Sequence, residues 1–324
     1  MTCSASAHEL WWTADRGLMA LSRLGDRETE ARAQSRILDF LHRHDHGRDR
    51  RTARAMAGLL AVALLAAACA GGSGRRGSST TTAPPAVTLR LEQPASRCGP
   101  PGDRAALLRF ASSDHVQLSG AMVGGGTAGV VLVHEYPADL CGFWPYAVYL
   151  GHKGLRVLDL DVRCYGRSSC PEGDARGHVA DDVAAAVAEL RRQGATRIAL
   201  VGASMGATAV LVAGAVIRPP VAAVVSLSGE RDLTELLGLA LNAGAAVPHL
   251  VSPTMYVVAT HDSNAPVEET RAMYRGTRAA DKDIMVLSGA DVGRHGWELL
   301  SDLQGHWTPV AAKVATFVLA HTHG

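Results

Sequence analysis

Short apolar runs alternate with amphipathic runs over the second two-thirds of the chain. The apolar runs predict strands, and they read "AGVVLVHEY", "LRVLDLDV", "TRIALVGAS", "VAAVVSLSG", "PTMYVVATHD" and "KDIMVLSGA". The segments between them have helical spacing and include "FWPYAVYLGHKG", "GHVADDVAAAVAELRRQG", "SMGATAVLVAGAVI", "VEETRAMYRGT" and "TPVAAKVATFVLAH". This alternation predicts an α/β fold, a mostly parallel twisted sheet with five or six parallel strands and helices on both faces, preceded by a hairpin in "AALLRFASSDHVQLSGAMV".

Helical crossovers between parallel strands are almost always right-handed, so the loops that follow the strands gather along one edge of the sheet. We therefore expect functional residues just beyond the carboxyl ends of the strands.

The insertion "ERDLTELLGLALNAGAAVPHLV" follows one predicted strand and has leucines at helical spacing. It is either a short helical cap or a crossover helix buried against the sheet. In both cases the cap is short or absent, which favours small or mid-sized substrates.

The N-terminal part of the chain is organised like an export signal. Residues 1–54 form a leader that ends in a basic stretch, residues 55–68 form an apolar run, and residues 69–86 carry Cys69 and a Gly/Ser/Thr/Pro linker, so the folded domain is expected over 87–324. The apolar run is shorter than the ~20 residues of a membrane-spanning helix.

The segment "LLAAAC", ending at Cys69, resembles the lipobox of bacterial lipoproteins, although Ala66 stands where leucine is most common. This resemblance implies lipid attachment at Cys69 and a place on the outer face of the cell membrane. A plain secretory signal or an uncleaved anchor is the alternative. Residues 1–42 make the leader unusually long, which indicates a mis-assigned start codon or a cytosolic extension. The run "HRHDH" at 42–46 is interpreted as a solvated leader, with no metal expected.

Composition and charge narrow the classes of partner. The chain has 324 residues, 47% hydrophobic and 19% charged, with a net charge of +1, which describes a globular protein without the basic excess of nucleic-acid binders. We expect no nucleic-acid partner.

The cysteines fit an exported protein. Beyond Cys3 and Cys69 they are Cys98, Cys141, Cys164 and Cys170, an even number that allows three disulfide pairings. The short loop "CYGRSSC" favours Cys164–Cys170, which leaves Cys98–Cys141. Free, partly buried thiols are the alternative.

The segment "VGASMGATAV" changes from strand to helix with almost no room to turn. Gly202 and Gly206 stand two positions either side of Ser204, the G-x-S-x-G spacing of a nucleophile elbow. A phosphate loop is disfavoured because the Lys-Ser/Thr ending is missing, and a merely structural Gly-Ser-Gly turn stays open at this point.

With these residues the chain resembles the α/β-hydrolase fold family over roughly 104–320. That family orders its triad as Ser, then Asp or Glu, then His. Here Asp262 follows "PTMYVVATH" and His295 lies in "SGADVGRHGWELL" after the last strand. The resemblance implies Ser204 as nucleophile, His295 as base and Asp262 as the acid that orients it. Four residues compete for the last two roles: Asp232 and Asp291 as the acid, and His306 and His261 as the histidine.

The resemblance also implies an oxyanion hole formed by the backbone amides of Met205 and Tyr136. Tyr136 lies in "HEYPADLCGFW", where His134 matches the family and Glu135 replaces the usual glycine. A Glu135 carboxylate pointing inward would repel a developing oxyanion and reduce activity or abolish it.

The sequence therefore predicts an exported serine hydrolase, similar to carboxylesterases, that cleaves a small-molecule ester through an acyl-enzyme on Ser204 without a cofactor. Two alternatives stay open. One is a peptidase or acyltransferase with the same triad, and the other is a non-catalytic binding protein that has kept the fold.

Overall fold

The computed structural model describes residues 90–92, 98, 105–289, 292–302 and 305–323. The chain divides into two compact units, Met1–Ala83 and Pro84–Gly324, and every described residue belongs to the second. The predicted leader, apolar run and linker, with Cys69, therefore lie outside the described residues. In the part of the chain that is described, no helix has the length and apolar character needed to span a membrane.

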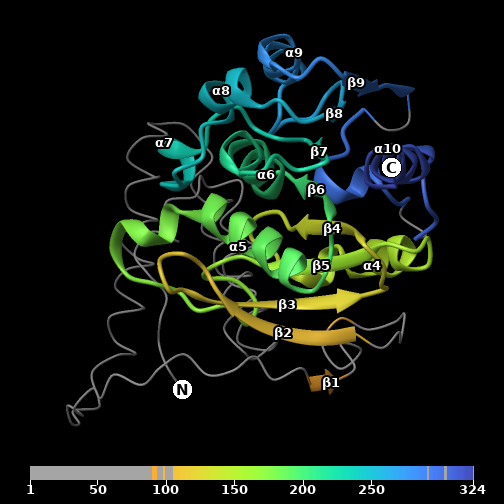
Figure 1. The fold of residues 1–324 in the computed structure, drawn as a ribbon. Coiled ribbons are helices and arrows are strands. Elements are labelled where there is room, and N and C mark those ends of the chain that lie inside the picture. Colours follow the sequence, from red (N-terminus) through yellow and green to blue (C-terminus); the bar gives the residue numbers. More distant parts are fainter. Residues whose placement is uncertain (1–89, 93–97, 99–104, 290–291, 303–304, 324) are drawn as a thin grey trace, which may run out of the picture. The chain divides into compact units, whose positions relative to one another are not determined.

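A nine-stranded sheet forms the centre of the domain, in the order β1-β2-β3-β5-β4-β6-β7-β8-β9 (Figure 1). The strands are β1 (Arg90–Glu92), β2 (Ala105–Ala111), β3 (Gln117–Val123), β4 (Ala128–Val133), β5 (Arg156–Asp161), β6 (Arg197–Ala203), β7 (Ala223–Leu227), β8 (Thr254–Ala259) and β9 (Lys282–Leu287). β1, β2, β3 and β5 pair antiparallel, and the six strands from β5 to β9 pair parallel. The predicted hairpin is β2–β3, whereas β1 was not predicted.

The apolar runs become the buried strands. Every residue of β4, β7 and β8 is buried. Helices cover both faces of a parallel sheet, so apolar and polar residues do not alternate along these strands. Strand β9 is only half-buried along its length, because it lies at the edge of the sheet.

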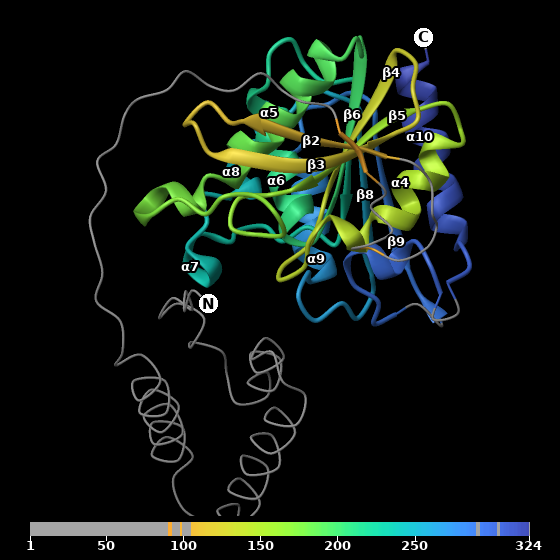
Figure 2. The ribbon, with the colours of Figure 1, turned by 90° about the horizontal axis from the view of Figure 1, so that it is seen from below.

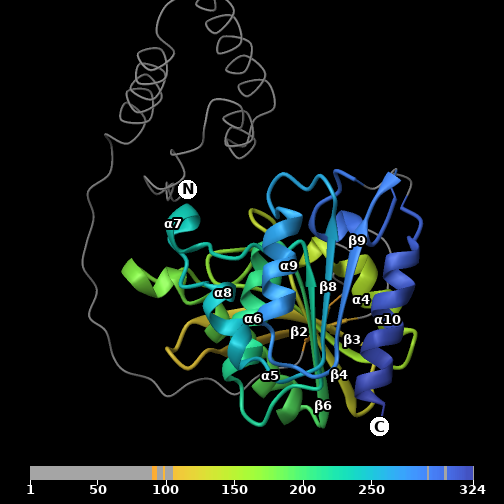
Figure 3. The same cartoon turned by 90° about the horizontal axis from the view of Figure 1, so that it is seen from above.

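Helices cover the two faces of the sheet in separate layers. Figures 2 and 3 show α5, α6, α8 and α9 on one face and α4 and α10 on the other. Their bounds are α4 (Trp144–Gly151), α5 (Val179–Arg192), α6 (Met205–Val216), α8 (Ala243–Ala246), α9 (Val267–Gly276) and α10 (Pro309–Thr322). A further short helix, α7, spans Thr234–Leu237, and single 3-10 turns are η3 (Leu140–Gly142), η4 (Gly173–Gly177), η5 (Val247–His249) and η7 (Gly296–Leu299).

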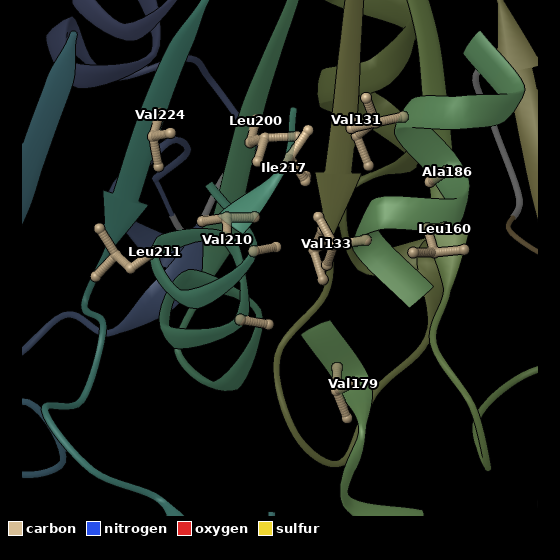
Figure 4. Packing of buried hydrophobic residues seen from close by; sticks show 14 of the residues in the cluster. Val131, Val133, Leu160, Val179, Ala186, Leu200, Val210, Leu211, Ile217 and Val224 are labelled. Atoms are coloured by element: carbon tan, nitrogen blue, oxygen red, sulfur yellow. The ribbon is translucent and has the colours of Figure 1, made fainter. Parts of the chain in front are cut away.

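Two hydrophobic clusters fill the spaces between the sheet and these layers. In the cluster under α5 and α6, valines and leucines from β4, β6 and β7 meet Val210 and Leu211 of α6 and Ala186 of α5 (Figure 4). Helix α6 is apolar on all its faces and ten of its residues are buried. The helix that follows Ser204 is therefore held by packing all around it.

The insertion after β7 is a compact crossover made of α7, α8 and η5, without one continuous helix. Leu233, Leu241, Val247 and Leu250 are buried in the same hydrophobic cluster as α6. The apolar positions of this segment thus pack on the domain, and the crossover interpretation of the insertion fits the structure.

Both predicted disulfides are present, Cys98–Cys141 and Cys164–Cys170. The loop that carries the second bridge starts beside Arg163, a fully buried residue. Its guanidinium donates to Asp182 at 2.7 Å and to Asp114 at 2.7 Å, which joins the carboxyl end of β5 to α5 and to the β2–β3 turn. Buried charges of this kind are tolerated only when they are paired and hydrogen-bonded.

Candidate active site

Ser204 lies at the turn between β6 and α6 in a backbone conformation that side chains rarely adopt, with φ 50° and ψ −118°. The two glycines around it make this turn possible. A Cβ at Gly202 would lie 2.2 Å from the carbonyl oxygen of Gly206, and a Cβ at Gly206 would lie 2.1 Å from the carbonyl oxygen of Val133. The spacing G-x-S-x-G is therefore required by close contacts of the main chain, which hold Ser204 in this strained conformation.

Asp262 and His295 meet at the same edge of the sheet. The His295 Nδ1 atom lies 2.9 Å from each carboxylate oxygen of Asp262. Asp262 Oδ1 also accepts hydrogen bonds from the amides of Asn264 and Ala265, both at 3.0 Å, so the carboxylate is fixed at the turn between β8 and α9. A carboxylate held in this way selects the tautomer with Nε2 unprotonated, which leaves Nε2 as an acceptor.

The electrostatics of this pair suit proton transfer. Burial raises the pKa of Asp262, but hydrogen bonds from His295 and the Ala265 amide outweigh it and bring the pKa below its usual range. Burial lowers the pKa of His295, but the carboxylate of Asp262 outweighs it, and Glu230 and Glu135 add to the net rise. The imidazolium that forms when His295 takes a proton is therefore stabilised.

The end of β4 lies against the first turn of α6, because the carbonyl oxygens of Val133 and His134 both approach Gly206 closely. His134 fixes this loop: its Nδ1 donates to the Glu135 carbonyl at 2.9 Å, and its Nε2 accepts from the Val162 amide at 3.2 Å. His134 is fully buried, so it acts as a structural clamp between the ends of β4 and β5. The first amides of a helix have no carbonyl acceptor within the helix, and Met205 is the first residue of α6.

Glu135 is directed at the turn that carries the candidate base. Its Oε2 lies 3.4 Å from the Trp297 amide, and a Cβ added to Gly296 would lie 1.8 Å from the same oxygen. Burial raises the pKa of Glu135 to about 7, against the opposing effect of His295. The side chain that replaces the family's glycine thus packs beside residues 295–297 and is partly protonated at neutral pH.

Glu230 is a site residue that the sequence analysis missed. The Ser204 hydroxyl donates to Glu230 Oε1 at 2.9 Å. Burial raises the pKa of Glu230, and the hydrogen bond from Ser204 acts in the opposite direction. Its position was a usable signal, because Glu230 follows β7 closely in the segment "SLSGE", as Asp262 follows β8.

The competing candidates lie elsewhere. Asp232 is exposed and accepts from the amide of Thr234 at 2.9 Å, and His306 is exposed and pairs with Asp302 at 3.1 Å. His261 is exposed next to Asp262. Asp291 lies outside the described residues.

Of the groups that could hold a metal ion, the described residues contain Asp114, His178 and Asp181, whose ligand atoms lie within 4.8 Å of one another. Asp114 already pairs with Arg163, which also holds its pKa low, at about 2. This cluster shares no residue with the Ser204 site.

Comparison with known proteins agrees with the geometry. Residues 129–284 match the family model described as "alpha/beta hydrolase fold". The chain has the α/β-hydrolase fold. The matched segment runs from β4 into β9, so it includes Ser204, Glu230 and Asp262. No curated protein matches the chain.

Solved structures of the same fold include several esterases. An esterase of Pyrococcus furiosus is 18% identical, with a TM-score of 0.57, and the match covers 68% of this chain and 93% of that one. The α/β hydrolase GrgF of Penicillium sp. is 16% identical, with a TM-score of 0.57 and coverage of 68% and 99%. A putative aryl esterase of Burkholderia cenocepacia is 14% identical, with a TM-score of 0.54 and coverage of 67% and 100%. At these identities the similarity establishes the fold alone.

Proposed function

We propose that this α/β-hydrolase-fold protein is a serine hydrolase that cleaves a small or mid-sized carboxylic ester through an acyl-enzyme on Ser204. The observation that carries the proposal is the strained Ser204 at the β6–α6 turn, on the same sheet edge as a histidine held at 2.9 Å by a buried carboxylate. The esterases among the structural neighbours support the same reaction class.

In the proposed mechanism Ser204 Oγ attacks the ester carbonyl while His295 Nε2 takes the hydroxyl proton, and Asp262 stabilises the resulting imidazolium. The amides of Met205 and Tyr136 stabilise the oxyanion. The tetrahedral intermediate then collapses, and His295 returns the proton to the departing alkoxide. A water molecule attacks the acyl-enzyme with His295 again as base, which releases the carboxylic acid and restores Ser204.

The resting contact of Ser204 adds one step. Because the hydroxyl donates to Glu230, its hydrogen must turn from Glu230 toward His295 before attack. Glu230 also interacts electrostatically with His295, so the serine and the imidazole share this carboxyl group as a neighbour.

Steady-state kinetics on nitrophenyl acetate test the mechanism. Ser204→Ala and His295→Ala are each expected to lower kcat by on the order of 10⁶-fold, as in well-studied triads. Asp262→Asn is expected to cost about 10⁴-fold, since the amide favours the wrong imidazole tautomer. Asp232→Asn is the matched control, an exposed carboxylate that bonds only to Thr234 and Asn242 among the hydrogen bonds of the described residues, and is expected to leave kcat unchanged. An active Ser204→Ala variant, or a folded wild-type protein that turns over no ester, would contradict the proposal.

Export and lipid attachment at Cys69 form the second part of the proposal, supported by the sequence of the leader. In a bacterial host, Cys69→Ala should move the protein from the membrane pellet to the soluble fraction or leave an unprocessed precursor. Normal processing together with unchanged membrane retention would contradict the lipid anchor.

A further inference from the structure

One carboxyl group beside the nucleophile has no role in the proton relay. Glu230 Oε1 accepts the Ser204 hydroxyl at 2.9 Å, whereas the relay itself uses only His295 and Asp262. A second carboxyl group, that of Glu135, also acts electrostatically on His295.

Glu230 is fixed in this position by the first turn of α6. Its backbone amide donates to Thr208 Oγ1 at 3.1 Å, and the same hydroxyl lies 3.0 Å from the Glu230 carbonyl oxygen and 3.2 Å from Oε2. Thr208 is fully buried one helical turn after Ser204. The carboxyl group is therefore held against the nucleophile.

The charge of Glu230 is not neutralised by a lysine or arginine side chain. Elsewhere in the domain two buried carboxylates pair with arginine, Asp182 with Arg163 and Glu189 with Arg192. Among the described residues, no lysine or arginine forms an ion pair with Glu230, and the cation that acts on it is His295. A partly buried carboxylate without a lysine or arginine beside it is costly, so a further positive charge supplied by a ligand would be favoured there.

The contact with Oγ decides where such a ligand must lie. An acyl group attached to Ser204 Oγ replaces the hydroxyl hydrogen on an atom that lies 2.9 Å from Glu230 Oε1, so the part of the ester next to the carbonyl is brought close to this carboxyl group. We infer that Glu230 is a specificity-determining residue that selects esters carrying a positive charge, such as an ammonium group, close to the scissile carbonyl. This inference rests on the proposed ester hydrolysis at Ser204. Esters with a carboxylate at the same place are disfavoured by repulsion.

The selection depends on the charged form of Glu230, which mildly alkaline pH favours. Burial raises the pKa of Glu230 and of Glu135, the latter to about 7, and His295 opposes the rise at both positions. Glu298 adds to the rise at Glu135, and Glu230 has the same effect there. A larger fraction of the Glu230 and Glu135 side chains is therefore ionised at pH 8 than at neutral pH, and the esters are compared at pH 8.

Two pairs of isosteric esters separate charge from shape. On the acyl side, the nitrophenyl ester of trimethylammonioacetate is compared with that of 3,3-dimethylbutanoate. On the alcohol side, acetylcholine is compared with 3,3-dimethylbutyl acetate. Each kcat/KM is divided by the ester's own rate constant with hydroxide, because the ammonium group also activates the carbonyl.

In at least one pair, the wild-type protein is expected to prefer the charged ester by tenfold or more after this correction. Glu230→Gln keeps the shape and an acceptor oxygen but removes the charge, so the preference should fall at least fivefold. Asp232→Asn removes one charge two residues away and should leave the preference unchanged. A second measurement needs no variant: tetramethylammonium ion should slow fluorophosphonate labelling of wild-type Ser204 more than neopentyl alcohol does.

Equal corrected kcat/KM values within both pairs, or a preference that survives Glu230→Gln, would overturn this inference. If neutral nitrophenyl esters are hydrolysed and Ser204 is labelled without any preference for charge, only the role of Glu230 fails. If no ester is hydrolysed and Ser204 is not labelled, the proposed function fails and this inference fails with it.

Discussion

Gly206→Ala should damage the catalytic geometry and the stability of the domain together. The added Cβ would lie 2.1 Å from the carbonyl oxygen of Val133 and 2.6 Å from that of His134. Such contacts are essentially never shorter than 3.0 Å, so the end of β4 must move by about 1 Å. The obstruction is main chain on a buried strand, which cannot turn aside as a flexible side chain can.

We expect a loss of about 2–3 kcal/mol in the free energy of unfolding, at the upper end of the cost of inserting one methyl group into a packed core. The same movement displaces the loop that carries Tyr136, so kcat/KM for nitrophenyl acetate should fall by about 100-fold. Urea unfolding and steady-state kinetics, both at a temperature where the variant is folded, measure the two effects.

Gly125→Ala is the matched control. No atom lies within 4 Å of a Cβ at Gly125, and its backbone is in a region open to other residues. Its unfolding free energy should stay within about 0.5 kcal/mol of the wild-type value. If Gly206→Ala were as stable and as active as Gly125→Ala, the explanation of the G-x-S-x-G spacing by close main-chain contacts would be wrong.

Two further predictions concern pH and the disulfides. Folding raises the pKa of Glu135 from 4.5 to about 7, so its contribution to stability is complete below pH 4.5 and is lost as the pH rises through 7. Glu135→Gln should therefore reduce the difference in unfolding free energy between pH 5 and pH 8 by up to about 3 kcal/mol. An unchanged difference would show that the pKa of Glu135 is not raised by folding. The bridges Cys98–Cys141 and Cys164–Cys170 span 43 and 6 residues. Replacing each pair by serine should cost about 4 and about 2 kcal/mol respectively in urea unfolding, and the reverse order would contradict the loop-closure argument.

Much of the fold was predictable because each buried parallel strand is a continuous apolar run between helical segments. The six parallel strands and the β2–β3 hairpin follow from that pattern. Strand β1 did not, because its three residues have no periodicity and depend on pairing with β2. The insertion was ambiguous because leucines at helical spacing fit one helix or several short turns equally well.

The part of the candidate site that depends on the positions of residues relative to the strands was predictable. Ser204, Asp262 and His295 each follow a predicted strand, and the parallel sheet brings their positions to one edge. The contact between Ser204 and Glu230 was not predictable, because it depends on the buried Thr208 that fixes the carboxyl group across the α6 turn. The orientation of the Glu135 side chain was not predictable either, because it depends on a turn that is distant in the sequence, at residues 295–297.

Fluorophosphonate labelling of the purified protein, read by peptide mass spectrometry, tests the nucleophile most directly. The serine hydrolase mechanism predicts one phosphonylated peptide, the one that contains Ser204, at a rate that falls sharply in His295→Ala. Labelling should be absent in Ser204→Ala, while Asp232→Asn reacts as the wild type does. A folded wild-type protein that stays unlabelled at Ser204, or a Ser204→Ala variant that is labelled equally fast, would contradict it.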